Sequence, residues 1–222
     1  MAGDAERFLH TARFYTGAGN RSQFPADEGT EVAFAGRSNV GKSSAINVLV
    51  SQRALARVSK QPGRTQQINF FQTADGCRLV DLPGYGYARV ARQVRQQWQG
   101  LMSEYFENRC SLRGVVVLMD SRHPLTVMDR QMLNWCGYLE LPVLLLLTKA
   151  DKLNRSQRHN VLQQVRSGCR DVLGEGRIPV NTVLFSALKR TGVSQARDII
   201  YQWLTGAADG LAHCDERFSP EL

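Results

Sequence analysis

Residues 36–43 form a glycine-rich segment that ends in a lysine and a serine. The segment consists of Gly36, Arg37, Ser38, Asn39, Val40, Gly41, Lys42 and Ser43, and it satisfies the pattern GxxxxGK[ST]. The glycines let successive backbone N–H groups converge on phosphate oxygens at a helix N-terminus, where the helix dipole adds positive potential. Lys42 supplies a point charge to the β and γ phosphates, and the Ser43 hydroxyl suits Mg²⁺. The pattern predicts a nucleoside triphosphate site and leaves the base and the reaction open.

Two later segments have the residue types to sense a third phosphate and its metal. Asp81 follows a strand of Val and Leu and can hold a Mg²⁺-bound water, and Gly84 offers an N–H to the γ phosphate and a pivot. Between the motifs, Thr65 can ligate Mg²⁺ from a loop, although its tetrapeptide alone is typical of a Pro-Gly turn. The phosphate-sensing residues are therefore Gly63, Arg64, Thr65, Asp81, Leu82, Pro83 and Gly84.

The base is predicted by a polar segment that follows the most apolar strand. Asp151 can accept hydrogen bonds from the ring N–H and the exocyclic amine of guanine, whereas adenine would leave this carboxylate unpaired. Lys149 is expected to lie along the base and to brace the phosphate loop. A segment after the last strand can offer a backbone N–H to the guanine carbonyl, although alone it equally suits a helix cap. The two segments comprise Thr148, Lys149, Ala150, Asp151, Ser186, Ala187 and Leu188.

Strand-like apolar runs alternate with helical patterns, which is typical of a parallel sheet with crossover helices. We predict a three-layer α/β/α fold with six strands, one of them antiparallel because residues 74–76 form a hairpin connection. The strands are expected at 31–36, 68–73, 77–81, 114–120, 142–148 and 180–186, and about five helices at 42–50, 92–108, 126–138, 155–173 and 192–205. Residues 1–30 are predicted to be an N-terminal extension, 31–205 the nucleotide-binding domain and 206–222 a tail.

The positive net charge of the sequence also predicts an anionic partner. The formal net charge is +8, and eight basic residues against two acids fall within residues 53–95, which include both predicted phosphate-sensing loops. Tyr85, Tyr87 and Trp98 lie in or near this segment, and aromatic rings beside guanidinium groups suit RNA. No apolar run reaches the length of a membrane span, so we expect no membrane insertion. The five cysteines form no CxxC pair and their number is odd, which predicts reduced thiols in the cytoplasm, and we expect a monomer. The basic residues of the segment are Arg53, Arg57, Lys60, Arg64, Arg78, Arg89, Arg92 and Arg95.

The motifs in this order resemble the P-loop GTPase domain of the Ras-like superfamily. GRSNVGKSS, KQPGRTQQINFF, RLVDLPGYGYA, VVVLMDSRHPL and LLLLTKADKL are similar to the bacterial EngB (YihA/YsxC) family of GTP-binding proteins, related to the Era and EngA class. The resemblance covers residues 31–204. It implies GTP and GDP as ligands of the segments above, and Mg²⁺ on Ser43 and Thr65. Asp81 is the further metal residue because of its place at a strand end. The resemblance also implies a role in large ribosomal subunit assembly, with rRNA contact, and in cell division and septation.

Two residues bear on the rate of hydrolysis. Ras-like enzymes place a water-orienting glutamine directly after DxxG, and this chain has Tyr85 there, which predicts slow intrinsic turnover that a partner activates. Asn39 can hold K⁺ beside the phosphates, or it can satisfy local backbone groups. The catalytic candidates are therefore Lys42, Thr65, Gly84 and Asn39. Two alternatives remain open: a P-loop ATPase or kinase, which Asp151 disfavours, and a nucleotide-stabilised scaffold in septum formation with incidental hydrolysis.

Overall fold

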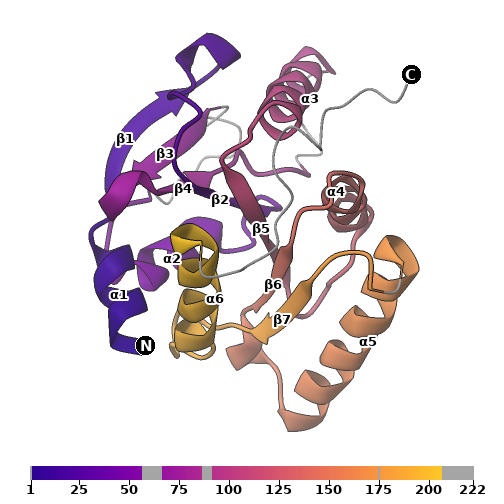
Figure 1. The fold of residues 1–222 in the computed structure, drawn as a ribbon. Helices are drawn as coiled ribbons and strands as arrows, with labels where there is room; N and C mark the ends of the chain where they lie inside the picture. The colour runs from indigo at the N-terminus through magenta and orange to yellow at the C-terminus, as the bar shows by residue number, and fades with distance from the viewer. Residues whose placement is uncertain (1, 57–66, 87–91, 175, 207–222) are drawn as a thin grey trace.

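The computed structural model describes residues 2–56, 67–86, 92–174 and 176–206, and its centre is a twisted sheet (Figure 1). In these residues the sheet has seven strands in the order β1-β3-β4-β2-β5-β6-β7. Strand β3 runs antiparallel to β1 and β4, and the other neighbouring pairs are parallel. The bounds are β1 (Arg13–Ala18), β2 (Glu31–Gly36), β3 (Ile68–Gln72), β4 (Arg78–Asp81), β5 (Leu112–Asp120), β6 (Val143–Thr148) and β7 (Val180–Leu184).

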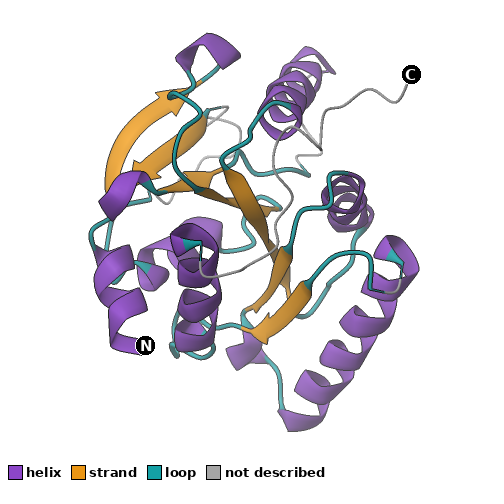
Figure 2. Ribbon diagram, in the orientation of Figure 1, coloured by secondary structure: helices purple, strands orange, loops and turns teal. Residues whose placement is uncertain are grey.

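Helices cover both faces of the sheet, so the described chain has three layers (Figure 2). One apolar cluster joins a sheet face to α3, α4 and α5, and a second joins the other face to α1, α2 and α6. Because both faces are covered, the strands β2 and β6 are buried along their whole length. The helices are α1 (Ala2–His10), α2 (Lys42–Leu49), α3 (Arg92–Glu107), α4 (Val127–Tyr138), α5 (Arg155–Leu173) and α6 (Val193–Thr205). None of these helices has the length and apolar character to cross a membrane.

The predicted class, the three layers and the single antiparallel strand are confirmed. The count of six strands and five helices is one too low in each case, because α1 and β1 form within the segment predicted as an extension. Strand β1 pairs with β3 through a bulge near Phe14 and Tyr15, two adjacent aromatic residues that are both more than half exposed. A strand with this pattern has no alternating buried face, so apolar periodicity does not reveal it.

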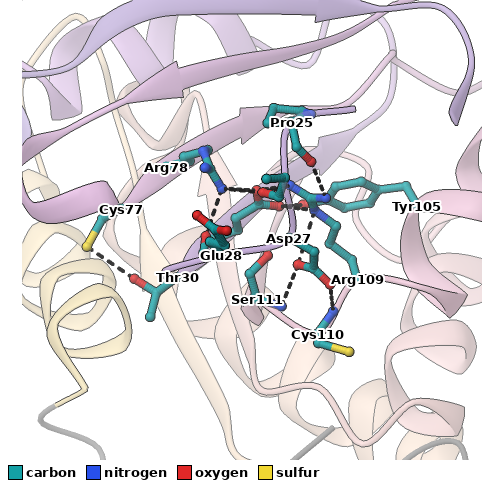
Figure 3. Close-up of polar contacts among 12 residues, drawn as sticks. Pro25, Asp27, Glu28, Thr30, Cys77, Arg78, Tyr105, Arg109, Cys110 and Ser111 are labelled. Carbon is teal, nitrogen blue, oxygen red and sulfur yellow. Dashed lines mark hydrogen bonds and ion pairs between the residues drawn. The ribbon is translucent and has the colours of Figure 1, made fainter. Parts of the chain in front are cut away.

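A buried carboxylate, Glu31, is the first residue of β2, at the sheet end opposite the phosphate loop. The side chains of Arg78, Tyr105 and Arg109 come together at this end (Figure 3). The Glu31 oxygens accept hydrogen bonds from Arg109 Nη2 at 2.6 Å, Arg78 Nη1 at 3.1 Å and the Tyr105 hydroxyl at 3.0 Å. Burial first, and then the charge of Glu31, raise the pKa of Tyr105 well above its usual value. These contacts tie the starts of β2 and β4 to the end of α3, which fixes the strands whose other ends carry the motifs.

The structure corrects one part of the charge interpretation. Arg78, counted among the basic residues of the 53–95 segment, is buried and paired with Glu31, so it is not available to an RNA on the surface. Arg53 is exposed as expected. Arg57, Lys60, Arg64 and Arg89 lie outside the described residues, and the side chains of Arg92 and Arg95 are likewise not described.

Candidate guanine-nucleotide site

The predicted phosphate loop joins the end of β2 to the start of α2, as the motif requires. Gly36 is buried, and a Cβ added there would lie 2.9 Å from Val40 Cγ1 and 3.1 Å from the Leu118 carbonyl oxygen. Gly41 has φ 101° at the N-cap of α2, a conformation that residues with side chains rarely adopt. The loop therefore turns tightly into the helix, so that the N-terminal N–H groups of α2 face the ligand side.

Lys42 and Asp81 meet at the mouth of this loop. The Lys42 ammonium forms an ion pair with Asp81 Oδ1, and both side chains are nearly nine-tenths buried. The pair connects the first residue of α2 with the last residue of β4, which brings the predicted phosphate and metal residues together as expected. Ser43 is the next residue of the same helical turn and is partly exposed. The Asp81 carboxylate and the Ser43 hydroxyl are oxygen ligands that suit Mg²⁺, and the Lys42 ammonium suits phosphate oxygens.

The metal site has few protein ligands in the described residues. No group of three or more His, Cys, Asp or Glu gathers there that could enclose a metal ion. Mg²⁺ is usually bound by one or two protein groups together with substrate phosphates and water, so Ser43 and Asp81 fit it. Gly63, Arg64 and Thr65, predicted for the γ phosphate and the metal, lie outside the described residues.

The Asp81–Gly84 segment is fastened to the phosphate loop by its backbone. The N–H of Ser38 donates to the Tyr85 carbonyl at 2.9 Å, and the N–H of Tyr85 donates to the Gly36 carbonyl at 3.2 Å. A Cβ on Gly84 would lie 3.3 Å from Ser38 Cα, so the two chains approach closely there. Leu82 and Pro83 are buried beside this contact. The two segments are therefore in direct contact through their backbones.

The predicted base residues also come together, at the ends of β6 and β7. Asp151 Oδ1 accepts a hydrogen bond from the Ser186 hydroxyl at 2.6 Å, and this bond is the main reason that the pKa of Asp151 lies below its usual value. The carboxylate is therefore ionised near neutral pH. The Thr148 hydroxyl is 2.8 Å from the Val40 carbonyl oxygen, and Ala150 is buried. The base loop and the phosphate loop are thus fixed to each other.

Lys149 braces the phosphate loop, as predicted. Its Nζ donates to the carbonyl oxygen of Asn39 at 3.0 Å. Asn39 is exposed and has φ 62°, and asparagine tolerates this left-handed conformation better than most residues. This backbone conformation accounts for an asparagine here without any cation.

In the segment after β7, the backbone N–H of Ser186 already forms a hydrogen bond within the protein. The N–H of Ser186 donates to the Thr191 carbonyl oxygen at 3.1 Å. The backbone donor expected for the guanine carbonyl therefore falls to Ala187 or Leu188, whose side chain is 75% exposed. Ser186 has a different role, because its hydroxyl orients Asp151.

Tyr85 occupies the place of the water-orienting glutamine, and its ring is buried. The hydroxyl donates to Asp129 Oδ1 at 3.0 Å, while the other oxygen of Asp129 caps α4 by accepting from the Thr126 N–H at 2.9 Å. Burial first, and then the Asp129 charge, raise the pKa of Tyr85 well above its usual value. The Tyr85 hydroxyl is hydrogen-bonded to Asp129 at the start of α4, so it is not available to orient a water molecule.

Replacing Tyr85 by phenylalanine should lower the free energy of unfolding by about 1–3 kcal/mol, because the buried Asp129 carboxylate loses a donor. Urea denaturation monitored by circular dichroism measures this loss. The matched control is Tyr138→Phe at a position that is 76% exposed, where the change should stay within about 0.5 kcal/mol. Equal effects of the two substitutions would contradict the importance of the buried bond.

Comparison with known proteins bears on this geometry. Residues 31–149 match the family described as 50S ribosome-binding GTPase. A probable GTP-binding protein EngB from Stenotrophomonas maltophilia is 53% identical over 196 residues, which cover 88% of this chain and 96% of that protein. The chain belongs to the EngB family of GTP-binding proteins. Another EngB relative, from Edwardsiella ictaluri, is 50% identical over 88% of both chains.

Solved structures agree with the EngB assignment at the level of the fold. A crystal structure of a probable GTP-binding protein engB superposes with a TM-score of 0.62 at 20% identity, covering 80% of this chain and 100% of that one. Era in complex with MgGDPNP and a fragment of 16S ribosomal RNA gives a TM-score of 0.58 at 18% identity, covering 82% of this chain and 58% of that one.

Sequence reasoning missed one residue of this EngB-family site, Asp120, the last residue of β5. Its carboxylate forms an ion pair with Lys149 Nζ at 2.9 Å and two hydrogen bonds with the Arg122 guanidinium at 2.9 and 2.7 Å. The hydrogen bond from Arg122 and that from Lys149 keep the pKa of Asp120 far below its usual range. Asp120 thus positions the lysine that braces the phosphate loop. The available signal was a carboxylate at the end of an apolar strand, the same signal that identified Asp81.

Proposed function

We propose that this protein is a GTP-hydrolysing switch that acts in assembly of the large ribosomal subunit and is needed for normal cell division. The observation that carries the proposal is the match of residues 31–149 to a family described as binding the 50S subunit. Two contacts support the nucleotide part: Lys42 at the start of α2 pairs with Asp81 at the end of β4, and Ser186 holds the Asp151 carboxylate.

Each group has a defined task in this function. Lys42 and the α2 N-terminus bind phosphate oxygens, and Asp151, held by Ser186, recognises the guanine edge. Bound Mg²⁺ neutralises charge on the β and γ phosphates. Gly84 can respond to the γ phosphate, because the backbone of its neighbour Tyr85 is hydrogen-bonded to the phosphate loop. Loss or gain of that phosphate then changes the conformation of the 53–95 segment, which contains eight basic residues and two acids.

Hydrolysis by the protein alone is expected to be slow. The buried, Asp129-bonded Tyr85 leaves the water-orienting position without a suitable side chain. An activating group must therefore come from a partner or from a cation. K⁺ held by Asn39 is the cation option that the sequence suggests.

Single-turnover GTP hydrolysis should proceed at least about tenfold faster in K⁺ than in Na⁺ at equal ionic strength if Asn39 holds the cation. Rapid mixing with phosphate detection measures the rate, and Asn39→Gly, which retains the left-handed backbone, should remove the difference. Equal rates in the two buffers would end the K⁺ proposal and leave Asn39 with its backbone role.

Co-sedimentation with purified bacterial large ribosomal subunits tests the switch. Wild-type protein should pellet with the subunits in a non-hydrolysable GTP analogue, and should be released by GDP. Equal binding in both nucleotides would contradict a switch on the ribosome and favour a nucleotide-stabilised scaffold in septum formation. Small ribosomal subunits serve as the control for nonspecific binding to RNA.

A further inference from the structure

Helix α5 carries unpaired positive charge on a face that nothing described above uses. The helix contains four arginines and one aspartate in nineteen residues. All four arginines are exposed, and three of them make no ion pair or side-chain hydrogen bond among the described residues: Arg155, Arg166 and Arg170. Arg158, by contrast, donates from Nε to the Ala150 carbonyl oxygen at 3.1 Å.

The three arginines share one stripe of the helix. At about 100° of rotation per residue, Arg155, Arg166 and Arg170 fall within about 60° of one another, together with His159. The stripe runs for about 22 Å along the helix axis. In Figure 1, α5 lies beside β7 at the outer side of the molecule, and this strand forms the sheet edge opposite β1. We call these three arginines and His159 the α5 stripe.

Within the α5 stripe only Arg170, in the last turn, lies where the helix dipole favours a cation. Arg155 is the first helical residue, where the helix dipole disfavours a cation, and the first turn has no acidic residue. Arg166 and Arg170 are four residues apart, a spacing at which like charges destabilise a helix by about 0.2–0.5 kcal/mol. Positions three and four residues from Arg166 within the helix hold no acid. A solvated helix would usually interleave carboxylates, so this arrangement favours an external anion.

The surroundings of the stripe indicate which anion it fits. Its exposed neighbours on the helix include the neutral, polar Asn160, Gln163 and Ser167, a further arginine, Arg158, and one acid, Asp171. A helix on a membrane surface would present large apolar residues, and a protein interface would present an apolar anchor. The exposed large apolar side chains of the described residues lie outside α5. Guanidinium groups in a row with no apolar anchor suit the phosphates of an RNA backbone.

The stripe is also fixed to the base-recognition loop. The N-cap of α5 is Asn154, three residues after Asp151, and its side chain accepts from the Gln157 N–H at 2.9 Å. Arg158 adds a bond from α5 to Ala150. None of these contacts involves the segment near the γ phosphate, so the stripe keeps its place in either nucleotide state.

We propose that the α5 stripe is a second RNA-binding surface, which holds backbone phosphates of ribosomal RNA equally in the GTP-bound and GDP-bound states. It deepens, and rests on, the proposed function on the large subunit. In this arrangement the stripe supplies sequence-independent, salt-sensitive binding, and the phosphate-sensing segment adds the part that depends on GTP. The substrate class is an RNA backbone, with no base-specific contact required.

The test compares two triple variants of the full chain that lose the same charge. Arg155→Gln/Arg166→Gln/Arg170→Gln removes the stripe, and Arg7→Gln/Arg13→Gln/Arg21→Gln removes exposed arginines from α1, from β1 at the opposite sheet edge, and from the turn after β1. Unchanged GDP affinity and circular dichroism spectra establish that both variants fold. Binding to purified large subunits and to a mixed-sequence 24-base-pair RNA duplex is then measured against salt, with the GTP analogue and with GDP.

The affinity of the stripe variant for RNA should fall about 10²-fold, by the same factor with the GTP analogue and with GDP. The slope of the logarithm of its binding constant against the logarithm of salt concentration should become smaller by about 2. The control variant should lose less than about threefold. Equal losses in the two variants, or tighter binding of the wild type to phosphatidylserine vesicles or polyglutamate than to RNA, would overturn the proposal. If wild-type protein fails to bind subunits, the proposed function fails, and the duplex measurement alone decides the stripe.

Discussion

Replacing Lys42 by alanine is expected to lower the affinity for GDP and GTP by about 10²–10³-fold, one of the two largest effects on this site. The ammonium is nearly buried against Asp81, so its removal eliminates a charged contact to phosphate and also leaves a carboxylate without its counter-charge. Truncating one member of a buried pair typically costs about 3–5 kcal/mol. The negative Asp81 would then repel the phosphates that Lys42 attracts.

Titration with a fluorescent GDP analogue measures this loss. The matched control is Lys152→Ala, because its side chain is 61% exposed and its ammonium is 3.9 Å from Asp151, outside the phosphate loop. That variant should stay within about threefold of the wild type, since exposed pairs contribute little. A Lys42→Ala protein that keeps wild-type affinity would place the phosphates elsewhere in the molecule.

Asp151→Asn should weaken GTP binding by about 10³-fold and make XTP the preferred nucleotide. The carboxylate accepts from the N–H groups of guanine, whereas an amide presents a donor toward them and leaves them unpaired. Xanthine has a carbonyl in place of the 2-amino group, and this carbonyl can accept from the amide. The Ser186 hydroxyl can still donate to the amide oxygen, so the loop should keep its conformation.

Competition of GTP and XTP for the labelled site distinguishes this reversal from simple damage. Asp171→Asn is a suitable control, because it makes the same chemical change on the exposed surface of α5. It should leave selectivity unchanged. An Asp151→Asn protein that still prefers GTP would overturn the assignment of the base site.

The sequence predicted most of this site because its residues sit at strand ends. Gly36, Asp81 and Thr148 each end a strand of the sheet, so a buried apolar run followed by a polar residue was enough to bring them to one edge. Five of the helices were predicted from a different signal, an apolar face that repeats with the helical period. Two of them, α4 and α5, also begin with capping boxes that fix their start.

The remaining features depend on packing between segments that are distant in sequence. Whether Tyr85 faces the ligand or the core is decided by Asp129, 44 residues further along the chain. Arg78 is buried because Glu31, 47 residues away, neutralises it. Strand β1 forms against β3 although its own aromatic residues remain exposed. A local sequence pattern does not reveal partners that lie far away in the sequence. Counting charges therefore overstated the surface charge of the 53–95 segment, because Arg78 is buried against Glu31.

The selectivity of the wild-type protein for its base tests the account most directly. Labelled GDP bound in Mg²⁺ buffer is displaced by unlabelled GDP or by unlabelled ADP, and the two inhibition constants are compared. The geometry of Asp151 and Ser186 predicts that GDP competes at least about 10³-fold more strongly than ADP, since adenine leaves the ionised carboxylate unpaired. Equal competition by ADP would contradict a guanine-nucleotide switch and would favour an ATPase or kinase built on the same fold.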